Sequence, residues 1–213
     1  MYSLTVPKMR RMELRHLNYI YCRHRHVDRN NTLIFSLFHK RRYLKRIAAL
    51  HESLGIPGDY GQTRAIPVQM EAAGLVSIGV DIYQREQRLV MEAAGAWESM
   101  RDYASGEGVE LQVVSAYRSV DYQEGILKRK LDEGQDIEEI LRISAAPGYS
   151  EHHTGRAVDI TTPGFPVLEE EFEQSGAFSW LLESAADFGF SMSFPRGNPH
   201  GVAYEPWHWA WRD

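Results

Sequence analysis

Two short segments of this 213-residue chain hold the histidines and carboxylates that most strongly constrain how the chain can fold. The first holds His152 and Asp159, and the second, much later in the chain, holds Glu205 and His208. Two imidazoles and a carboxylate are a ligand set typical of a catalytic zinc ion, which keeps a fourth position open. Glu205 adds a carboxylate that can deprotonate a water molecule at that position. The sequence therefore predicts a zinc hydrolase whose fold brings both segments together.

The spacing of the first segment indicates a loop that leads into a strand. His152 and Asp159 are separated by seven positions with Gly155 between them, which does not suit the i, i+4 face used by helical zinc sites. On a strand, Ala157 and Asp159 would share one face, and the small Ala157 would leave room for an ion. A buried carboxylate flanked by apolar residues is costly, and a metal ion would compensate it.

Other histidines are also candidate ligands when only the residues are considered. His153 adjoins His152, and the spacing does not distinguish the two. His200 lies in a Gly/Pro-rich stretch, where surface histidines are common. The ordinary alternative for each single residue is a surface histidine or a salt-bridged aspartate.

Residues around the two segments suggest a substrate cleft. Aromatic residues surround Glu205 and would raise the pKa of its carboxyl group towards the range of a general base; a plain hydrophobic strand is the alternative. Arg118 follows a predicted strand, and its guanidinium suits a carboxylate or a forming oxyanion, although a salt bridge to an acidic residue explains it equally well. Ser115 and Gln123 could add neutral hydrogen bonds to a substrate terminus.

Charge is distributed unevenly along the chain. Residues 1–50 carry 12 Lys and Arg against 2 Asp and Glu, a net charge of +10, and because the whole chain carries −5, residues 51–213 carry −15. We therefore expect a basic, partly disordered N-terminal extension over residues 1–60 and one domain over residues 61–213. The alternative is an arm that makes weak contact with an anionic surface, or an adaptor for membrane or nucleic acid.

Several classes of protein are excluded or disfavoured. The chain has one cysteine, Cys22, so an intramolecular disulfide is impossible and a zinc site must use histidines and carboxylates. No GxSxG motif occurs, and Cys22 lies away from the two segments, which disfavours a serine or cysteine hydrolase. No stretch has the length of a membrane span, and the apolar run 33–38 is shorter than a signal-peptide core, so we expect no export signal.

The apolar pattern predicts helices and strands without a regular alternation. Helical spacing indicates helices over residues 43–50, 85–104, 121–131, 136–143 and 178–188. Stretches rich in β-formers indicate strands over residues 109–115, 156–161 and 205–211. Because no βαβ repeat is present, the expected fold class is α+β.

The three segments together resemble the LAS zinc peptidases. Residues 150–159 match the SxHxxGxAxD signature of that family, and residues 205–209 match its ExxHW signature. The stretch 115–119 with Gln123 resembles its D-alanyl-D-alanine carboxypeptidase branch, peptidase family M15, which includes the vancomycin-resistance carboxypeptidases. The likeness covers roughly residues 80–213. It implies the LAS or Hedgehog-type fold, a small antiparallel sheet with flanking helices.

The resemblance also implies roles for individual residues. The zinc ligands it implies are His152, Asp159 and His208, which places His153 outside the coordination sphere. It implies Glu205 as the catalytic base and Arg118 as the residue that holds the substrate carbonyl or oxyanion. The residues it suggests for the substrate pocket are Ser115, Gln123, Ser150 and Trp209.

The function expected from the resemblance is a zinc carboxypeptidase that removes terminal D-alanine from peptidoglycan stem peptides. Its partners would be those peptides, not nucleic acid, and such a substrate implies the periplasm or cell envelope. One alternative is an endopeptidase of the same fold, which cuts the L-alanyl-D-glutamate bond or the cross-bridge. The other is a wall-binding module without activity, which the complete ligand set and base disfavour. Oligomeric state is not predicted.

Overall fold

The computed structural model describes residues 29–212, with side chains from residue 37 onward. Residues 1–28 of the basic arm, which include Cys22, lie outside the described residues. The chain divides into two compact units, Met1–Arg41 and Arg42–Asp213, and the predicted site lies in the second. This unit starts at Arg42, and Ile47 and Leu54 are buried in it; the expected domain start at residue 61 stays a prediction. No described helix is long and apolar enough to cross a lipid bilayer.

The second unit mixes short helices with short strands, as the sequence predicted. Its α-helices are α1 (Arg29–Leu54, which starts in the first unit), α2 (Tyr60–Thr63), α3 (Met91–Gly106), α4 (Val120–Asp132), α5 (Ile137–Ile143) and α6 (Gly176–Ser184). Its strands are β1 (Leu75–Val80), β2 (Glu86–Val90), β3 (Gln112–Ser115), β4 (Ala157–Thr161), β5 (Phe190–Met192) and β6 (His208–Trp211). Three short 3-10 helices complete it: η1 (Glu151–Thr154), η2 (Glu170–Gln174) and η3 (Ala185–Phe188).

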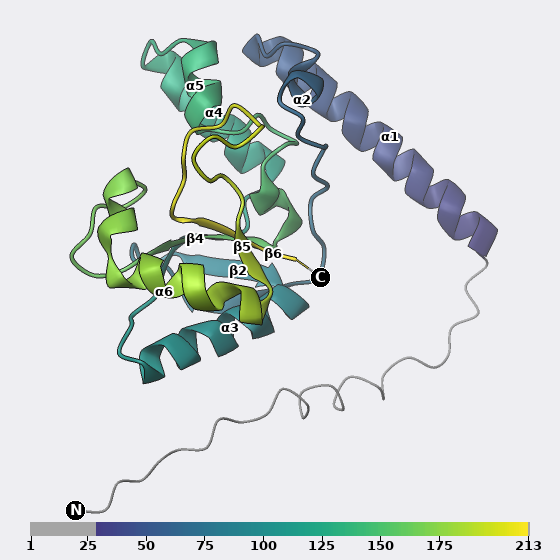
Figure 1. Ribbon diagram of the computed structural model, residues 1–213. Coiled ribbons are helices and arrows are strands. Elements are labelled where there is room, and N and C mark those ends of the chain that lie inside the picture. The colour runs from purple at the N-terminus through teal and green to yellow at the C-terminus, as the bar shows by residue number, and fades with distance from the viewer. Residues whose placement is uncertain (1–28, 213) are drawn as a thin grey trace, which may run out of the picture. The chain divides into compact units, whose positions relative to one another are not determined.

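A four-stranded antiparallel sheet forms the centre of the unit. Its strand order is β3-β4-β6-β5, so β4 lies inside the sheet, and all five of its residues are buried. Helices α3 and α6 lie on one side of β4 and β6, and α4 and α5 lie on the other (Figure 1). This arrangement confirms the predicted α+β class with a small antiparallel sheet and flanking helices.

Two hydrophobic clusters hold these layers together. The larger one joins α3 and α6 to the sheet through side chains such as Trp97, Phe178 and Val158. The smaller one joins the end of α1 to α4 and α5 through Leu54, Leu127 and neighbouring residues. Because side chains alternate along a strand, Val158 and Ile160 of β4 enter the larger cluster, and Ala157, Asp159 and Thr161 face the other way.

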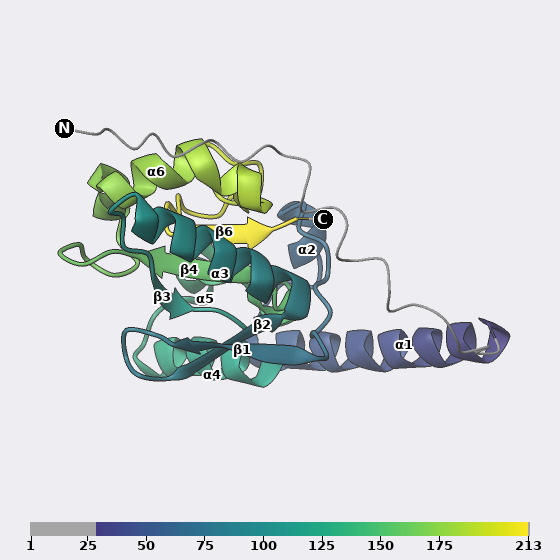
Figure 2. The same cartoon turned by 90° about the horizontal axis from the view of Figure 1, so that it is seen from below.

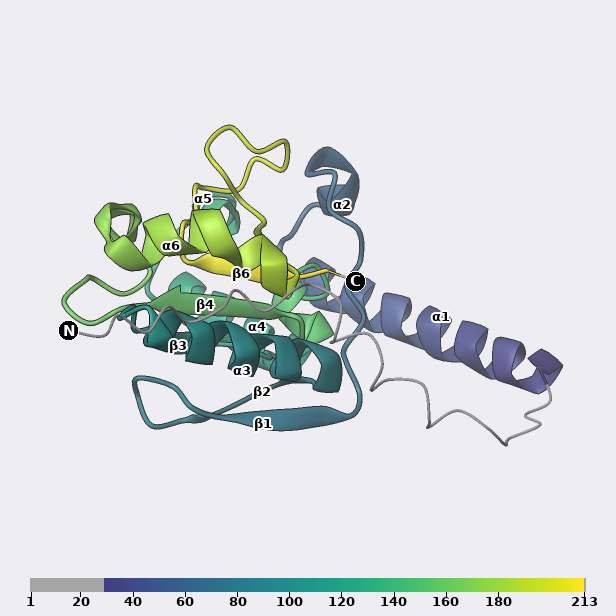
Figure 3. The ribbon, with the colours of Figure 1, turned by 60° about the horizontal axis from the view of Figure 1, so that its bottom comes forward.

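A hairpin replaces the first part of a helix that the sequence predicted. We expected one helix over residues 85–104, but Glu86–Val90 is strand β2, paired antiparallel with β1, and the helix begins at Met91. Leu89 and Val90 fit helical spacing and strand pairing equally well, and the distant partner β1 decides between them. The hairpin packs against α3 on the side away from α6 (Figures 2 and 3).

Several other predicted elements have different bounds in the structure, among them the last strand and the first helix. The strand expected over residues 205–211 is formed only by β6, because Glu205–Trp207 makes a turn in which Pro206 has no N–H to donate to a strand. The short helix expected over residues 43–50 is part of the longer α1, and Gly55, with a φ of 69°, follows its end.

Gly155 joins η1 to β4 in a conformation that favours glycine. Its φ is 63° and its ψ is 24°, in the left-handed region. A Cβ atom at this position would lie 2.7 Å from Leu75 Cδ2 and 3.2 Å from Val90 Cγ1. Backbone conformation and packing therefore both require glycine between His152 and Asp159.

We predict that Gly155→Ala destabilises the protein by about 1–3 kcal/mol, because it combines a left-handed backbone with overpacking. Gly95→Ala is the matched control: Gly95 lies within α3 with nothing within 4 Å of a built Cβ, so the substitution should stabilise by roughly 0.5–1 kcal/mol. Urea unfolding of both variants tests the pair. Equal stability of Gly155→Ala and the unmodified protein would show that this turn has no special requirement.

Candidate metal centre

Strand pairing brings three residues of the predicted site into one row. Asp159 of β4 pairs with His208 of β6 on one side and with Ser115 of β3 on the other. Directly opposed residues of antiparallel strands have their Cβ atoms about 4.5–5.5 Å apart on the same face. The sheet therefore presents a carboxylate between an imidazole and a hydroxyl, on the face opposite the larger core.

His152 joins this row from η1, just before the Gly155 turn. One ligand atom each from His152, Asp159 and His208 lies within 4.8 Å of the others, and all three residues are buried. His152 Nε2 lies 3.2 Å from Asp159 Oδ2, and His208 Nδ1 lies 2.9 Å from Asp159 Oδ1. The structure thus brings together the three residues that the sequence offered as ligands, from three separate elements.

The two ring nitrogens of His152 are arranged as in a metal-binding imidazole. Its Nδ1 lies 2.5 Å from the Ala116 carbonyl oxygen, which can only accept, so this nitrogen donates and Nε2 carries a lone pair. Nε2 is buried and has no hydrogen-bond partner among the residues that the structure describes. A buried lone pair beside a carboxylate and a second imidazole matches the His and Asp ligand set of catalytic zinc sites. The residues present therefore fit zinc.

Glu151 orients the second imidazole, a contact that the sequence analysis did not identify. His208 Nε2 lies 2.9 Å from Glu151 Oε2, which directs Nδ1 of the same ring towards Asp159. Glu151 in turn accepts hydrogen bonds from Ser193 at 2.5 Å and from Arg212 at 2.7 Å. Its place beside His152 in the first motif was the available signal.

Burial and charge set the protonation of these groups. Burial, assisted by the charge of Arg118, lowers the pKa of His152 to about 4, so its imidazole is neutral at physiological pH. Burial alone would raise the pKa of Asp159, but the two histidines hold it below its usual value. For His208, burial opposes the charge, yet the carboxylates of Asp159 and Glu151 raise its pKa to about 10. The carboxylates therefore favour a positive charge at this point.

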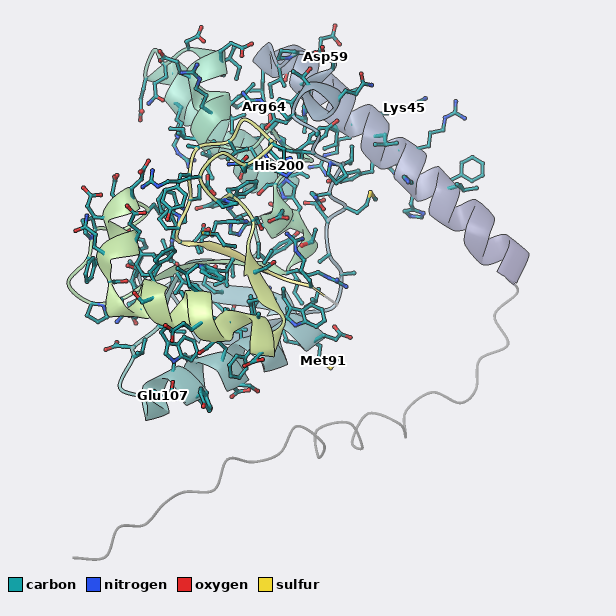
Figure 4. All side chains as sticks on the ribbon, viewed as in Figure 1. Lys45, Asp59, Arg64, Met91, Glu107 and His200 are labelled. Atoms are coloured by element: carbon teal, nitrogen blue, oxygen red, sulfur yellow. The ribbon has the colours of Figure 1, made fainter. Side chains whose placement is uncertain are left out.

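The other candidate histidines lie outside the cluster. His153 Nδ1 contacts the Arg118 carbonyl at 2.6 Å, and its Nε2 accepts from the Gly148 N–H at 3.1 Å, so backbone groups occupy both nitrogens. His200 lies beside Arg64 (Figure 4), with its Nδ1 3.1 Å from the Arg64 carbonyl. Neither is part of the group that could hold a metal ion.

Glu205 lies next to the cluster with a perturbed carboxyl group. Its Oε2 is 3.9 Å from His208 Nδ1, and its side chain is only 14% exposed. Burial raises the pKa of Glu205 to about 7, and the Asp159 carboxylate adds to the shift. A carboxyl group with a pKa near neutrality can both accept and return a proton at physiological pH.

A cleft of about 500 Å³ opens onto these groups, between the α4–α5 side and the C-terminal segment. Its wall includes Asp159 and Glu205 together with the cations Arg118 and Lys130. Arg118 Nε is buried and makes no hydrogen bond within the described part of the chain. Lys130, which the sequence analysis did not identify, donates to Ser144 Oγ at 3.1 Å, and burial lowers its pKa.

The residues expected to bind substrate have different surroundings. Ser115 lines a second cavity of about 290 Å³ that also includes Arg118 and Tyr117. Gln123 is buried, its amide donates to the Ala145 carbonyl, and its Oε1 has no partner among the described residues. Ser150 is buried beside η1.

Trp209 is a core residue in this structure. It is 3% exposed, packs against Phe178 in the larger cluster and donates to the Pro206 carbonyl. Alternation along β6 places it on the face opposite His208. Its placement gives no support to the expected contact with substrate, which stays a prediction.

Comparison with known proteins assigns the chain to a family. Residues 86–213 match the model of the family described as VanY, D-alanyl-D-alanine carboxypeptidase. The putative carboxypeptidase YodJ of Bacillus subtilis strain 168 is 33% identical over 168 residues, which cover 76% of this chain and 58% of that protein. The chain thus spans somewhat more than half the length of this curated relative.

Two solved structures share the fold. The LD-carboxypeptidase LdcB is 34% identical, with a TM-score of 0.60 over 68% of this chain and 71% of that one. A mutant of the vancomycin-resistance D,D-pentapeptidase VanY, solved in complex with Zn(II), is 28% identical, with a TM-score of 0.53 over 68% of this chain and 82% of that one. With the family match over most of its length, this chain belongs to the VanY D-alanyl-D-alanine carboxypeptidase family.

Proposed function

We propose that this chain is a zinc-dependent carboxypeptidase that removes the terminal D-alanine from peptidoglycan stem peptides. The observation that carries the proposal is the buried group of His152, Asp159 and His208, with Glu205 beside it in an open cleft. Membership of the VanY family supports the same activity and substrate.

In this proposal His152 Nε2, a carboxylate oxygen of Asp159 and His208 Nδ1 hold the zinc ion. Zinc, when bound, supplies a Lewis acid that polarises the scissile carbonyl and acidifies the attacking water. The Ala116 carbonyl and Glu151 keep both imidazoles in the tautomer that presents the ligand nitrogen to the ion.

Glu205 moves the proton in the reaction. Its carboxylate accepts a proton from the attacking water and delivers that proton to the leaving amine, so that one carboxyl group acts as base and then as acid. The low exposure of its side chain and its pKa of about 7 suit both steps.

The two cations of the cleft suit a peptide that ends in a carboxylate. Arg118, with an unpartnered buried Nε, can donate to the scissile carbonyl as its oxygen becomes negative. Lys130 lies in the same cleft and can attract the terminal carboxylate, a group that an endopeptidase does not need to recognise. The same wall also carries Glu169 and Glu170, so it is these two cations, and not the overall charge of the cleft, that support cleavage at the end of a peptide.

The product of the reaction tests the proposed function. We expect the protein with zinc to convert stem pentapeptides to tetrapeptides plus free D-alanine, with loss of activity in a chelator and recovery when zinc is restored. Mass spectrometry of the digest measures this directly. Tetrapeptides offered in parallel test for the L,D-activity named for LdcB. Release of a larger peptide, or of nothing, would contradict the proposal.

Glu205→Gln should lower kcat by roughly 10²–10⁴-fold, because the amide cannot accept a proton, while zinc stoichiometry stays at one. Glu183→Gln, an exposed position on α6, is the matched control and should keep full activity. A Glu205→Gln variant with normal turnover would disprove this role.

In the unmodified protein, kcat/KM should fall as the pH drops through about 7, since protonation removes the base.

A further inference from the structure

We propose that Asp81 and Gln87 are positioning residues for the metal centre, which act on His152 through the peptide of Ala116. The proposal rests on the proposed function, since it assumes that His152 binds zinc. Asp81 and Gln87 lie in the hairpin region around β1 and β2, not in either histidine motif.

The backbone that follows β3 supports both buried histidines of the first motif. The Ala116 carbonyl accepts from His152 Nδ1 at 2.5 Å, and the Arg118 carbonyl contacts His153 Nδ1 at 2.6 Å. The Arg118 N–H also donates to the His152 carbonyl at 3.3 Å. The path of residues 115–118 therefore sets the direction in which the His152 ring points.

Gln87 fixes this backbone from the other side. The Ala116 N–H donates to Gln87 Oε1 at 2.8 Å, and Gln87 Nε2 donates to Asp81 Oδ2 at 2.8 Å. Both ends of the Gln87 amide are thus used, one for the peptide and one for the carboxylate. Because a peptide unit is planar, this contact fixes the plane that holds the Ser115 carbonyl and the Ala116 N–H. The Ala116 carbonyl belongs to the next peptide plane, which is joined to the first by the φ and ψ torsions of Ala116, so anchoring the first plane restrains the second.

Asp81 is anchored by its own turn. Its carboxylate is fully buried and accepts from the Tyr83 N–H at 2.8 Å, the Arg85 N–H at 3.0 Å and Arg85 Nε at 2.7 Å, in addition to Gln87. Arg85 then donates to the Val114 carbonyl at 3.1 Å. The chain of contacts runs from a rigid, charge-assisted turn to the end of β3 without a gap.

The same contacts explain why the hairpin and β3 meet where they do. Backbone bonds from Ile82 N to the Val113 carbonyl and from Tyr117 N to the Arg88 carbonyl lie on either side of the Gln87 contact. Between them, the Gln87 side chain takes the place of a backbone partner for the buried Ala116 N–H. Removing it leaves that N–H unpaired, and the peptide must turn to find another acceptor.

A turn of the peptide that carries the Ala116 N–H would pass through the Ala116 torsions to the next peptide and move the carbonyl that accepts from His152 Nδ1. Partners that orient a metal-bound imidazole typically change metal affinity or activity by about 10–100-fold when they are altered. We therefore expect the effect of Gln87 to appear in zinc binding and in kcat, and not only in stability.

The first test compares Gln87→Met with Gln112→Met. Gln112 lies on β3, and its side chain donates to Glu110 at 2.7 Å, away from the histidines. Zinc affinity is measured in the full-length protein by competition with a chromophoric chelator. We expect Gln87→Met to bind zinc about tenfold more weakly, and at saturating zinc to show a lower kcat with a KM near that of the unmodified protein. Gln112→Met should match the unmodified protein in each respect.

A double substitution tests the hydrogen-bond chain itself. Asp81→Asn alone can place an NH₂ group against Gln87 Nε2, whereas Asp81→Asn with Gln87→Glu reverses the donor and acceptor and restores the link. We expect the double variant to regain at least part of the zinc affinity that Asp81→Asn loses. Wild-type zinc affinity and kcat in Gln87→Met, with only a lower melting temperature, would overturn the proposal. Zinc binding is read without substrate, so failure to release D-alanine would count against the proposed function alone.

Discussion

The structure depends on one buried carboxylate. Asp159 is 3% exposed in the inner strand of the central sheet, where an isolated negative charge would be costly. Two imidazoles lie within 3.2 Å of its oxygens. Apolar side chains in place of these imidazoles would leave the carboxylate charge unpaired. The convergence of η1, β4 and β6 supplies these two partners, and a cation bound at the same point would complete the compensation.

The surrounding contacts fix the direction in which each imidazole ring points. Glu151 holds the far nitrogen of His208, and the Ala116 carbonyl holds the far nitrogen of His152, so neither ring can turn its ligand atom away. The larger core fixes the other face of the sheet, and the α4–α5 side forms the opposite wall of the cleft. A rigid sheet face thus meets an open cleft at the point where Glu205 and Arg118 lie.

The parts of this arrangement that the sequence predicted are those encoded by local patterns. The turn at Gly155, the strand that carries Asp159, the helices α4 and α5 and the α+β class follow from spacing and glycine placement. The hairpin was missed because the apolar residues of β2 also fit a helix, and only pairing with β1 distinguishes the two. The contacts of Glu151 with His208, of Gln87 with Ala116 and of Trp209 with Phe178 join residues far apart in the chain, so spacing alone does not reveal these partners.

The most direct test of the account is the position of the metal. In crystals of the zinc-loaded protein, an anomalous difference map at the zinc edge should show one peak within about 2.0–2.2 Å of His152 Nε2, an Asp159 oxygen and His208 Nδ1. The fourth position should face the cleft that Glu205 and Arg118 line. A peak at His153 or His200 instead, or no peak at the three residues, would contradict the central claim.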